Sequence, residues 1–230
     1  RDRLRTPSGL MNLLQMTVLS YYFGNNGRTP YVHYMLLLGI PAFLGQLIAA
    51  GAAPKLADKH GAATTFAQAN VFAGLALLAA FALFLCRPQQ LTQALPFTLL
   101  ILLLFCNMFC CGLVNTVQSI LIADAADLTE KESGIRRDGI FVSGQSLLIK
   151  LSTGVSALLQ GLVFAISGFS GTAVRQINRA LYAGADFATD PSFATPRFAM
   201  FFLFLCLPGI AYLLSALPYR KGRNPHKAPV

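Results

Sequence analysis

The sequence has few charged residues for its length. Aspartate, glutamate, lysine and arginine make up 12% of its 230 residues, whereas a soluble domain carries about 25%. Hydrophobic residues make up 55% of the chain and are gathered in long blocks. This pattern excludes an ordinary soluble domain and predicts an integral membrane protein whose surroundings are a lipid bilayer.

Histidine and cysteine are also scarce. The three histidines, His33, His60 and His226, lie in or near loops and share no motif, so the chain lacks the side-chain constellation of an enzyme. The five cysteines are too few, and odd in number, for a disulfide framework. Cys106 and Cys110 are four residues apart and could hold a soft metal, but we prefer cysteine as a small core hydrophobe. We expect no catalytic residue and no metal site.

Acidic residues are half as frequent as basic ones. The chain has nine acidic residues against 18 lysines and arginines, and its net charge is +9. Such a charge could indicate nucleic-acid binding, but no basic patch lies outside the loops expected between apolar segments. Lysine and arginine collect in the cytoplasmic loops of membrane proteins. We therefore expect no nucleic-acid partner.

Six apolar segments divide the chain. They are residues 8–23, 31–53, 64–86, 96–122, 140–168 and 198–217. A membrane-spanning helix needs about 20 apolar residues, and only the first segment is short. The sequence predicts an all-α integral membrane protein with six transmembrane helices. A short surface helix is also expected at RQINRALYAG, within the longest connection.

The basic residues divide unevenly between the two sides of such a membrane protein. On the side of the termini twelve are found: Arg1, Arg3, Arg5, Lys55, Lys59, Lys131, Arg136, Arg137, Arg220, Lys221, Arg223 and Lys227. The opposite loops carry five: Arg28, Arg87, Arg175, Arg179 and Arg197. The excess predicts that both termini of this segment lie in the cytoplasm.

Lys150 lies inside the fifth apolar segment. It stands about 15 Å along a helix from the start of that segment, near the middle of a hydrocarbon core about 30 Å thick. A charge there costs about 2.5–3.5 kcal/mol on insertion scales and usually faces a bundle interior or a water-filled path. Helical spacing predicts one polar and small stripe: Ser143, Ser146, Lys150, Thr153, Ala157 and Gly161. We prefer a functional cavity to the alternative, a lysine that snorkels to the interface.

The segment before it ends in polar and then acidic residues. Asn107, Asn115 and Gln118 lie within about one helix face, either as hydrogen-bonding glue between helices or as cavity lining. A charged cluster follows: Asp124, Asp127, Glu130, Lys131, Glu132, Arg136, Arg137 and Asp138. Two interpretations stay open for this cluster, an ordinary solvated loop and a set of interdomain ion pairs that open and close.

The stretch ADAADLTEKESGIRRDGIFVSGQSLLIK, residues 123–150, resembles the loop and eleventh helix of the glycoside–pentoside–hexuronide:cation symporters. These form the melibiose-permease-like branch of the major facilitator superfamily, with a pattern of roughly A-D-x-x-D-Y-G-E-x-K-T-G-x-R-x-E-G, then F-S and a lysine. The positions in register are Ala123, Asp124, Asp127, Glu130, Gly134, Arg136, Asp138, Gly139, Ser143 and Lys150. Leu128 and Thr129 replace the Tyr-Gly pair and Glu132 replaces a basic residue, which changes the expected ion-pair wiring.

A second stretch, PKLADKHG at residues 54–61, is similar to the short cytoplasmic loop G-x-L-A-D-R-x-G that follows the superfamily's eighth helix. Asp58 at its centre is expected to cap or pair with a helix terminus, with a plain charged turn as the alternative. The resemblance covers residues 1–230 as the C-terminal six-helix bundle of a twelve-helix transporter. It implies that the N-terminal bundle is missing. The opening RDRLRTPSG also leads us to expect a fragment.

The resemblance implies roles for particular residues. Asn115 stands where a relative has an aromatic residue that stacks on the sugar, and Gln118, Gln145, Ser146 and Lys150 match polar positions at or beside the substrate cavity. The resemblance implies that Lys150 pairs with acidic residues of the missing bundle that bind Na⁺ or H⁺, or contacts an anionic sugar. The expected cytoplasmic gate comprises Asp124, Asp127, Glu130, Arg136 and Asp138.

The predicted function is symport of a sugar or glycoside, including an anionic hexuronide, across the cell (inner) membrane by alternating access. The coupling ion is Na⁺ or H⁺, and no other cofactor is expected. Two alternatives stay open. A carrier of a lysolipid or other amphiphile should have an apolar slot open to the bilayer, and a membrane scaffold would transport nothing.

Overall fold

The computed structural model describes residues 18–24, 32–134, 138–166 and 171–217, and the regular elements in these ranges are all helical. A π-helical turn, η1 (Leu19–Phe23), comes first. The long helices are α2 (Val32–His60), α3 (Ala62–Cys86), α4 (Ala94–Ser133) and α5 (Asp138–Ile166). The surface helix α6 (Gly171–Tyr182) is followed by η3 (Pro191–Phe193), α7 (Ala194–Phe201), η4 (Phe202–Cys206) and α8 (Leu207–Ala216).

Five helical stretches in these ranges are long and apolar enough to cross a membrane. They confirm the prediction of an all-α membrane protein. The first expected span, residues 8–23, lies for the most part outside the described residues. The surface helix expected at RQINRALYAG is also present, as the second half of α6 and the turn after it.

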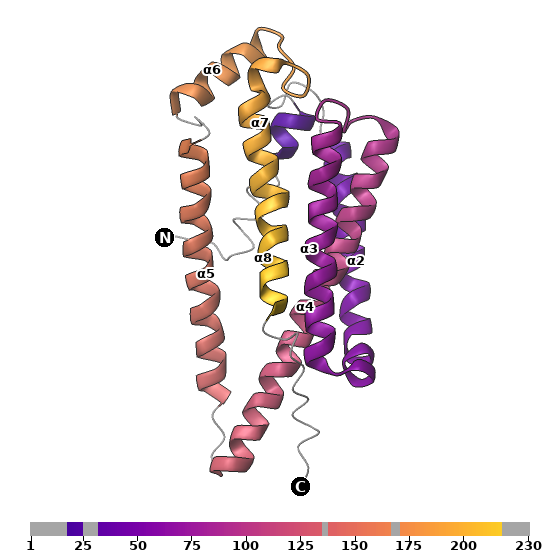
Figure 1. Cartoon of the computed structure of the whole chain (residues 1–230), viewed down its shortest axis with the longest axis vertical. Helices are drawn as coiled ribbons and strands as arrows, with labels where there is room; N and C mark the ends of the chain where they lie inside the picture. The colour runs from indigo at the N-terminus through magenta and orange to yellow at the C-terminus, as the bar shows by residue number, and fades with distance from the viewer. Residues whose placement is uncertain (1–17, 25–31, 135–137, 167–170, 218–230) are drawn as a thin grey trace.

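The helices are arranged as a packed group and one helix apart (Figure 1). α2 and α3 both pack on α4, and α8 packs on α3. α5 stands on the far side of α8, and in its central window Val142–Leu159 the buried share is 0%. A helix with so little buried surface has faces left for lipid, ligand or another protein segment.

Glycines allow the closest helix contacts. A Cβ on Gly112 of α4 would lie 2.7 Å from the Gln46 carbonyl oxygen of α2 and 2.8 Å from the Ala49 Cβ. A Cβ on Gly74 of α3 would lie 2.8 Å from the Gly209 carbonyl oxygen of α8. Small residues drive association of membrane helices because backbones can approach and gain van der Waals contact. These positions therefore hold α2 on α4 and α3 on α8.

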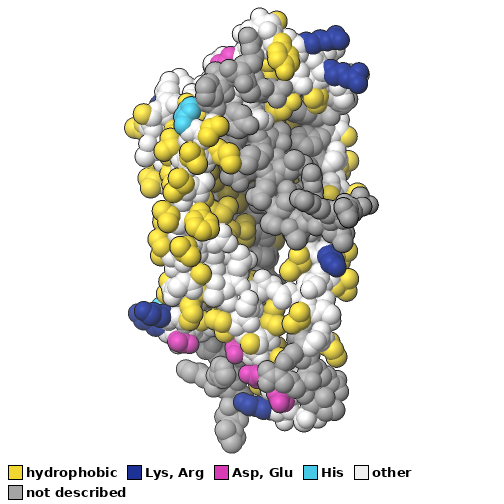
Figure 2. Space-filling view, turned by 180° about the vertical axis from the view of Figure 1, so that it is seen from behind, with side chains coloured by type: hydrophobic (Ala, Val, Ile, Leu, Met, Phe, Trp, Pro, Cys, Tyr) yellow, Lys and Arg dark blue, Asp and Glu magenta, His cyan; other side chains and the backbone are white. Residues whose placement is uncertain are grey.

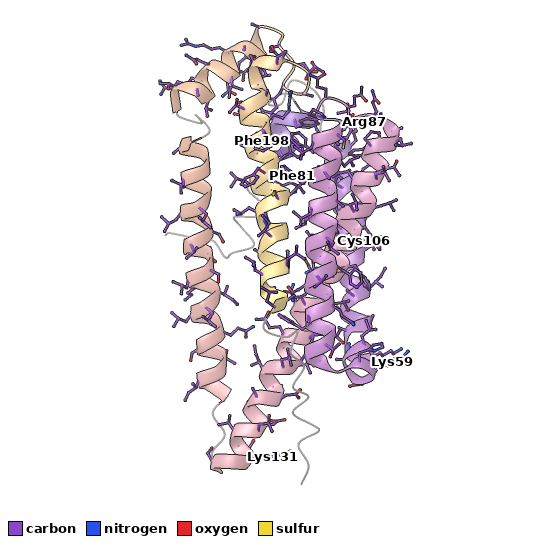
Figure 3. All side chains as sticks on the ribbon, viewed as in Figure 1. Lys59, Phe81, Arg87, Cys106, Lys131 and Phe198 are labelled. Carbon is purple, nitrogen blue, oxygen red and sulfur yellow. The ribbon has the colours of Figure 1, made fainter. Side chains whose placement is uncertain are left out.

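Aromatic side chains fill the core near Arg87, which Figure 3 labels. The rings of Phe84 and Phe201 stack with centroids 4.1 Å apart and an interplanar angle of 9°. Phe187, which is 0% exposed, packs between Tyr21 and Phe193 at centroid distances of 5.6 and 5.3 Å. Buried aromatic rings remove large apolar areas from solvent, so this cluster joins η1, the connection after α6, and the α3 and α7 helices.

Charged side chains gather mainly at the two ends of the molecule, and the surface between them carries many apolar side chains together with a basic side chain at mid-height (Figure 2). Lys59 and Lys131 lie at one end and Arg87 at the other (Figure 3). We call these the Lys131 end and the Arg87 end. This division is the one expected of a protein whose middle is covered by hydrocarbon.

Two helices continue past the apolar spans that the sequence predicts. α4 runs to Ser133 rather than ending near residue 122, and Gly134 ends it in the left-handed conformation, φ 69°. α2 runs to His60, so residues 54–60 are helix and not loop, and only Gly61, with φ 86°, separates it from α3. Glycine adopts such φ values without a Cβ penalty, and both stops are therefore glycines.

Prolines lie inside or beside the long helices, and the kinks expected at them stay a prediction. Pro41 and Pro54 lie inside α2. Pro208 lies in the first turn of α8, directly after the π-helical turn η4. Proline has no N–H to donate in a helical hydrogen bond, and its ring crowds the carbonyl four residues before it. A π-helical turn accommodates the missing hydrogen bond, so that η4 and α8 form one continuous helical rod.

Candidate functional site

A cavity of about 1130 Å³ lies between α3, α4, α5 and the η4–α8 rod. That volume is somewhat above the roughly 300–1,000 Å³ of most ligand pockets. Its lining is mostly apolar, and the described lining residues carry no charge. Two residues of the predicted substrate cavity, Gln118 on α4 and Gln145 on α5, line it.

Some polar groups of the lining are already used to join helices. Ser215 of α8 donates from its hydroxyl to Asn70 Oδ1 of α3 at 2.9 Å, and the Asn70 Nδ2 donates to the Phe66 carbonyl at 2.8 Å. The Tyr212 hydroxyl of α8 and the Cys111 sulfur of α4 form a hydrogen bond of 3.0 Å. These bonds satisfy polar groups that would otherwise be costly in an apolar interior.

Other polar groups of the lining have no partner in the part of the chain that the structure describes. They are the side chains of Gln118, Gln145, Ser152 and Ser156. Each amide offers two N–H donors and a carbonyl acceptor, and each hydroxyl offers both functions. The cavity can therefore form several hydrogen bonds to an uncharged molecule.

Lys150 faces a different direction from the cavity. It is exposed and is absent from the lining, whereas Ile149, Ser152 and Ser156 line it. At about 100° per residue, Lys150 is about 160° from Ser152 around the helix. In the described part of the chain no ion pair or hydrogen bond reaches its ammonium group. α5 therefore presents the cavity on one face and a lone cation on the other.

The structure also shows where the remaining candidates for the substrate site lie. Asn115 and Ser146 are exposed and are outside the cavity lining, and Ser146 lies one turn from Lys150. Thr153 of the polar stripe lines the cavity edge, and its hydroxyl donates to the Ile149 carbonyl at 2.7 Å. Gln118 and Gln145 line the same cavity, and Lys150 is outside its lining. That all five candidates share one substrate cavity stays a prediction.

The charged candidates lie on helix ends at the Lys131 end. Asp124, Asp127 and Glu130 are on the last turns of α4, which corrects their expected place in a loop. Arg136 lies outside the described residues, and Asp138 is the first residue of α5. Their role as a gate stays a prediction.

Asp58 is on the last turns of α2, where it is exposed. In the described ranges its carboxylate has no hydrogen-bond or ion-pair partner. The described residues also contain no group of three or more His, Cys, Asp or Glu side chains that could hold a metal.

Sequence reasoning did not single out Asn70, Tyr212 and Ser215. Each is a polar residue within a predicted apolar segment. Such residues usually face other helices in a membrane protein, and this was the available signal. Their meeting in one cavity depends on α3 and α8 being neighbours, which no local pattern encodes.

The fold and the cavity define a multi-pass helical membrane protein with a pocket between α3, α4, α5 and α8 whose described lining is uncharged. Over residues 8–220 the chain matches the MFS/sugar transport protein family, and it belongs to that family. It is 26% identical over 167 residues to an uncharacterized 29.9 kDa protein in the crtE 3′ region of Pseudescherichia vulneris, covering 73% of this chain. The chain spans 56% of that relative's length. No solved structure matches significantly.

Proposed function

We propose that this chain is part of a secondary active transporter that moves a sugar or glycoside, including an anionic hexuronide, together with Na⁺ or H⁺. Membership of a family described as MFS/sugar transport proteins supports transport of a sugar. The single observation that carries the coupling is Lys150, an exposed lysine without a partner among the described residues, near the middle of a membrane-spanning helix. Such a cation is costly in lipid and is kept where it serves an ion or substrate path.

The proposed role of Lys150 is to balance charge in the transport path. Its face of α5 would meet the acidic residues of an N-terminal six-helix bundle, the partner expected for this half. The coupling ion would bind mainly on that bundle and would compete with Lys150 for the same carboxylates. Binding of the ion then changes the affinity for the sugar, and binding of the sugar changes the affinity for the ion by the same factor. This mutual change in affinity is the coupling that symport requires.

The proposal also includes location and orientation. The protein would lie in the cell (inner) membrane with both ends of this segment in the cytoplasm. The Lys131 end carries the basic residues that favour that side. The transported sugar, the coupling ion, the lipid bilayer and the N-terminal bundle are the expected partners, with no cofactor besides the ion.

Replacing Lys150 tests the proposed function. In the complete transporter, Lys150→Ala should abolish sugar accumulation driven by a cation gradient, because the charge that couples the two sites is gone. Lys150→Arg keeps a cation and should retain part of the activity. Uptake of radiolabelled sugars into proteoliposomes, with and without a Na⁺ or H⁺ gradient, measures this.

Arg179→Gln supplies the matched control, since it removes a positive charge from the exposed surface of α6. This variant should accumulate sugar as the unchanged protein does. Gradient-driven accumulation by Lys150→Ala at the unchanged rate would remove Lys150 from the mechanism.

One observation favours a second candidate function, a carrier of an amphiphile within the same family. The cavity is lined mainly by apolar side chains, as expected for a cargo with a hydrocarbon part. Competition for uptake distinguishes the two functions. If a lysolipid is the cargo, it should inhibit uptake of the sugar and should itself accumulate. A sugar transporter should accumulate only the sugar.

A further inference from the structure

The surface helix α6 crosses the Arg87 end of the molecule, beyond the end of α5 (Figure 1). α5 ends at Ile166 and α6 begins at Gly171, so only residues 167–170 join them. A bilayer is about 40–45 Å thick with its polar layers and about 30 Å thick in its hydrocarbon core, which leaves about 5–8 Å for each polar layer. A helix that begins so soon after a membrane-spanning helix lies at the level of the lipid head groups.

One face of α6 is fixed to the protein. Ile177 and Leu181 are buried in the aromatic core near Arg87. The Tyr21 hydroxyl of η1 donates to Asn178 Oδ1 at 3.1 Å from the same side of the helix. The buried apolar pair and this hydrogen bond together set the rotation of α6 about its own axis. They therefore also determine which side chains of α6 point away from the protein.

The opposite face of α6 is basic. Arg175 and Arg179 are both exposed, and they are one turn apart, about 6 Å along the helix axis. At about 100° per residue, each arginine is about 160° around the helix from Ile177. Tyr182, which is 69% exposed, is about 20° from Arg175 on this face. Figure 2 shows two basic side chains that project sideways at the Arg87 end, over the bilayer surface rather than along the molecule.

The two arginines have no partner in the part of the chain that the structure describes. Neither guanidinium forms an ion pair or a hydrogen bond there, and the sequence of α6 contains no acidic residue. The next acidic residues along the chain are Asp186 and Asp190. Both accept hydrogen bonds from residues of their own connection. The positive charge of this face is therefore not balanced by α6 or by the connection that follows it.

The other described basic residues at the Arg87 end are used inside the protein. Arg197 is buried and donates to two backbone carbonyls of the connection after α6. Arg87 donates to Gln90 Oε1 at 3.3 Å. Membrane proteins carry few basic residues on the side away from the cytoplasm, which is the side expected for this end. An unpaired arginine pair kept on that side indicates a partner outside the described chain.

We propose that Arg175 and Arg179 bind the phosphate of an anionic phospholipid, such as phosphatidylglycerol, in the leaflet at the Arg87 end. At this depth the anions beside the protein are lipid phosphates, and a guanidinium binds phosphate through two parallel N–H donors. A zwitterionic head group brings its own cation and gains less from a basic pair. Tyr182 completes the site, because tyrosine rings are stable at the level of the head groups.

This site goes beyond the proposed transport function, because the lipid belongs to the surrounding membrane and is not a cargo. α6 contributes no residue to the cavity lining. Lys150 is about 24 Å along α5 from Ile166, the residue of α5 nearest to α6 in the sequence. The bound lipid holds α6 and the connection after it at the membrane surface. Its loss should leave sugar accumulation unchanged.

Tryptophan fluorescence can detect the lipid, because the chain contains no tryptophan. The full chain with Tyr182→Trp is placed in vesicles in which phosphatidylcholine is replaced stepwise by phosphatidylglycerol brominated near the glycerol end of its acyl chains. Quenching should show about tenfold preference for phosphatidylglycerol over brominated phosphatidylcholine. Phe43→Trp, on the exposed surface of α2, detects lipid far from α6 and should show no preference.

Variants of the two arginines, made together with Tyr182→Trp, test the site directly. Replacing both Arg175 and Arg179 with glutamine should abolish the preference, whereas replacing both with lysine keeps the charges and should retain most of it. The matched control is Arg87→Gln, which removes one positive charge at the same end from the other side of the molecule (Figure 3). This control should keep the full preference.

Four results would overturn the proposal: equal quenching by the two lipids, the same preference at Phe43→Trp, full preference in the double-glutamine variant, or loss of preference in the double-lysine variant. Loss of the preference on adding inorganic phosphate at constant ionic strength would instead assign the arginines to a soluble anion, and would also overturn it. Should the double-glutamine variant not give a monodisperse helical protein, salt provides a second measurement. The preference should fall as the Debye length shortens from about 10 Å at 0.1 M to about 3 Å at 1 M salt.

Lys150→Ala separates this proposal from the transport proposal. With Tyr182→Trp in the same chain, it should keep the full lipid preference while the complete transporter loses coupled uptake. Loss of the preference in Lys150→Ala would show that lipid binding depends on the transport path, and would overturn a separate site on α6.

Discussion

At the scale of residues, the polar side chains inside the spans fall into two groups. One group joins helices: Asn107 Nδ2 donates to the Ala73 carbonyl at 3.2 Å, and Cys111 bonds Tyr212 at 3.0 Å. The other group, represented by Gln118 and Lys150, has no partner in the described chain. Hydrogen bonds between membrane helices stabilise packing by about 1 kcal/mol each, so the first group is structural. The second group is available for ligands or for another protein segment.

Glycine at the contact of α2 and α4 is also a residue-scale feature, and it yields a stability prediction. Gly112→Ala should destabilise the protein by about 1–3 kcal/mol, as overpacking does, because its Cβ would lie 2.7 Å from the Gln46 carbonyl oxygen. Thermal unfolding followed by circular dichroism in detergent measures the loss.

The matched control is Gly51→Ala on α2. A Cβ there meets nothing within 4 Å, so this variant should be neutral or slightly more stable, since alanine favours helix over glycine. Equal unfolding temperatures for the two variants would contradict the close α2–α4 packing.

At the scale of elements, the connection after α6 is built as a cap over the Arg87 end. The Asp186 carboxylate accepts from the Ala188 backbone N–H at 3.2 Å and from the Thr189 hydroxyl at 3.0 Å. The guanidinium of Arg197, which is 4% exposed, donates to the Phe187 and Ala188 carbonyls. The Tyr22 hydroxyl donates to the Pro88 carbonyl at 2.8 Å. Segments from four parts of the sequence are thus held together at this end.

Asp190 in this cap gives a prediction about pH. Its side chain accepts from the Ser192 hydroxyl at 2.7 Å and from the Ser192 N–H at 2.9 Å, and these bonds lower the pKa of the carboxyl below its ordinary value. A lowered pKa in the folded state means that ionisation stabilises folding. The contribution is complete above the ordinary aspartate range, and it is lost as the pH falls through the lowered pKa.

Asp190→Asn should therefore have a lower unfolding temperature than the unchanged protein at pH 7 and nearly the same one below the pKa of Asp190. Unfolding scans of both proteins across this pH range measure the difference. A difference that stays constant with pH would show that the charge of Asp190 is not involved.

At the scale of the whole molecule, charged side chains distinguish the two ends. Lys59 and Lys131 lie at one end and Arg87 at the other (Figure 3). The apolar wall between them carries exposed side chains such as Phe43 and Leu47, which are 66% and 59% exposed. This surface needs hydrocarbon around it, because contiguous apolar areas of such extent are not stable in water.

The orientation leads to a labelling prediction for the complete protein. In a background where the five cysteines are replaced by serine or alanine, Lys59→Cys should react with a membrane-impermeant maleimide only from the cytoplasmic side. Arg87→Cys should react only from the opposite side, because the basic excess favours a cytoplasmic Lys131 end. Labelling of right-side-out and inverted vesicles distinguishes the sides, and the reverse pattern would refute the orientation.

The helical fold could be predicted from the sequence because a bilayer demands about 20 apolar residues in each spanning helix. The ends of α2 and α4 could not be predicted in this way. The last turns of both helices are polar, and Gly61 and Gly134 rather than hydrophobicity set where the helices end. The family resemblance implied Gln118 and Gln145 as cavity residues, and both line the cavity in the structure. That Lys150 points away from this cavity follows only from how α5 is rotated about its own axis in the fold.

The sequence by itself determined the class of the protein, the approximate spans and the presence of a costly intramembrane lysine, since these depend on composition and on spacing along one helix. The tertiary structure alone decided which polar side chains share a cavity, because Asn70, Gln118, Gln145 and Ser215 belong to four different helices. Side chains distant in sequence meet only when close glycine contacts and aromatic packing fix the positions of the helices that carry them.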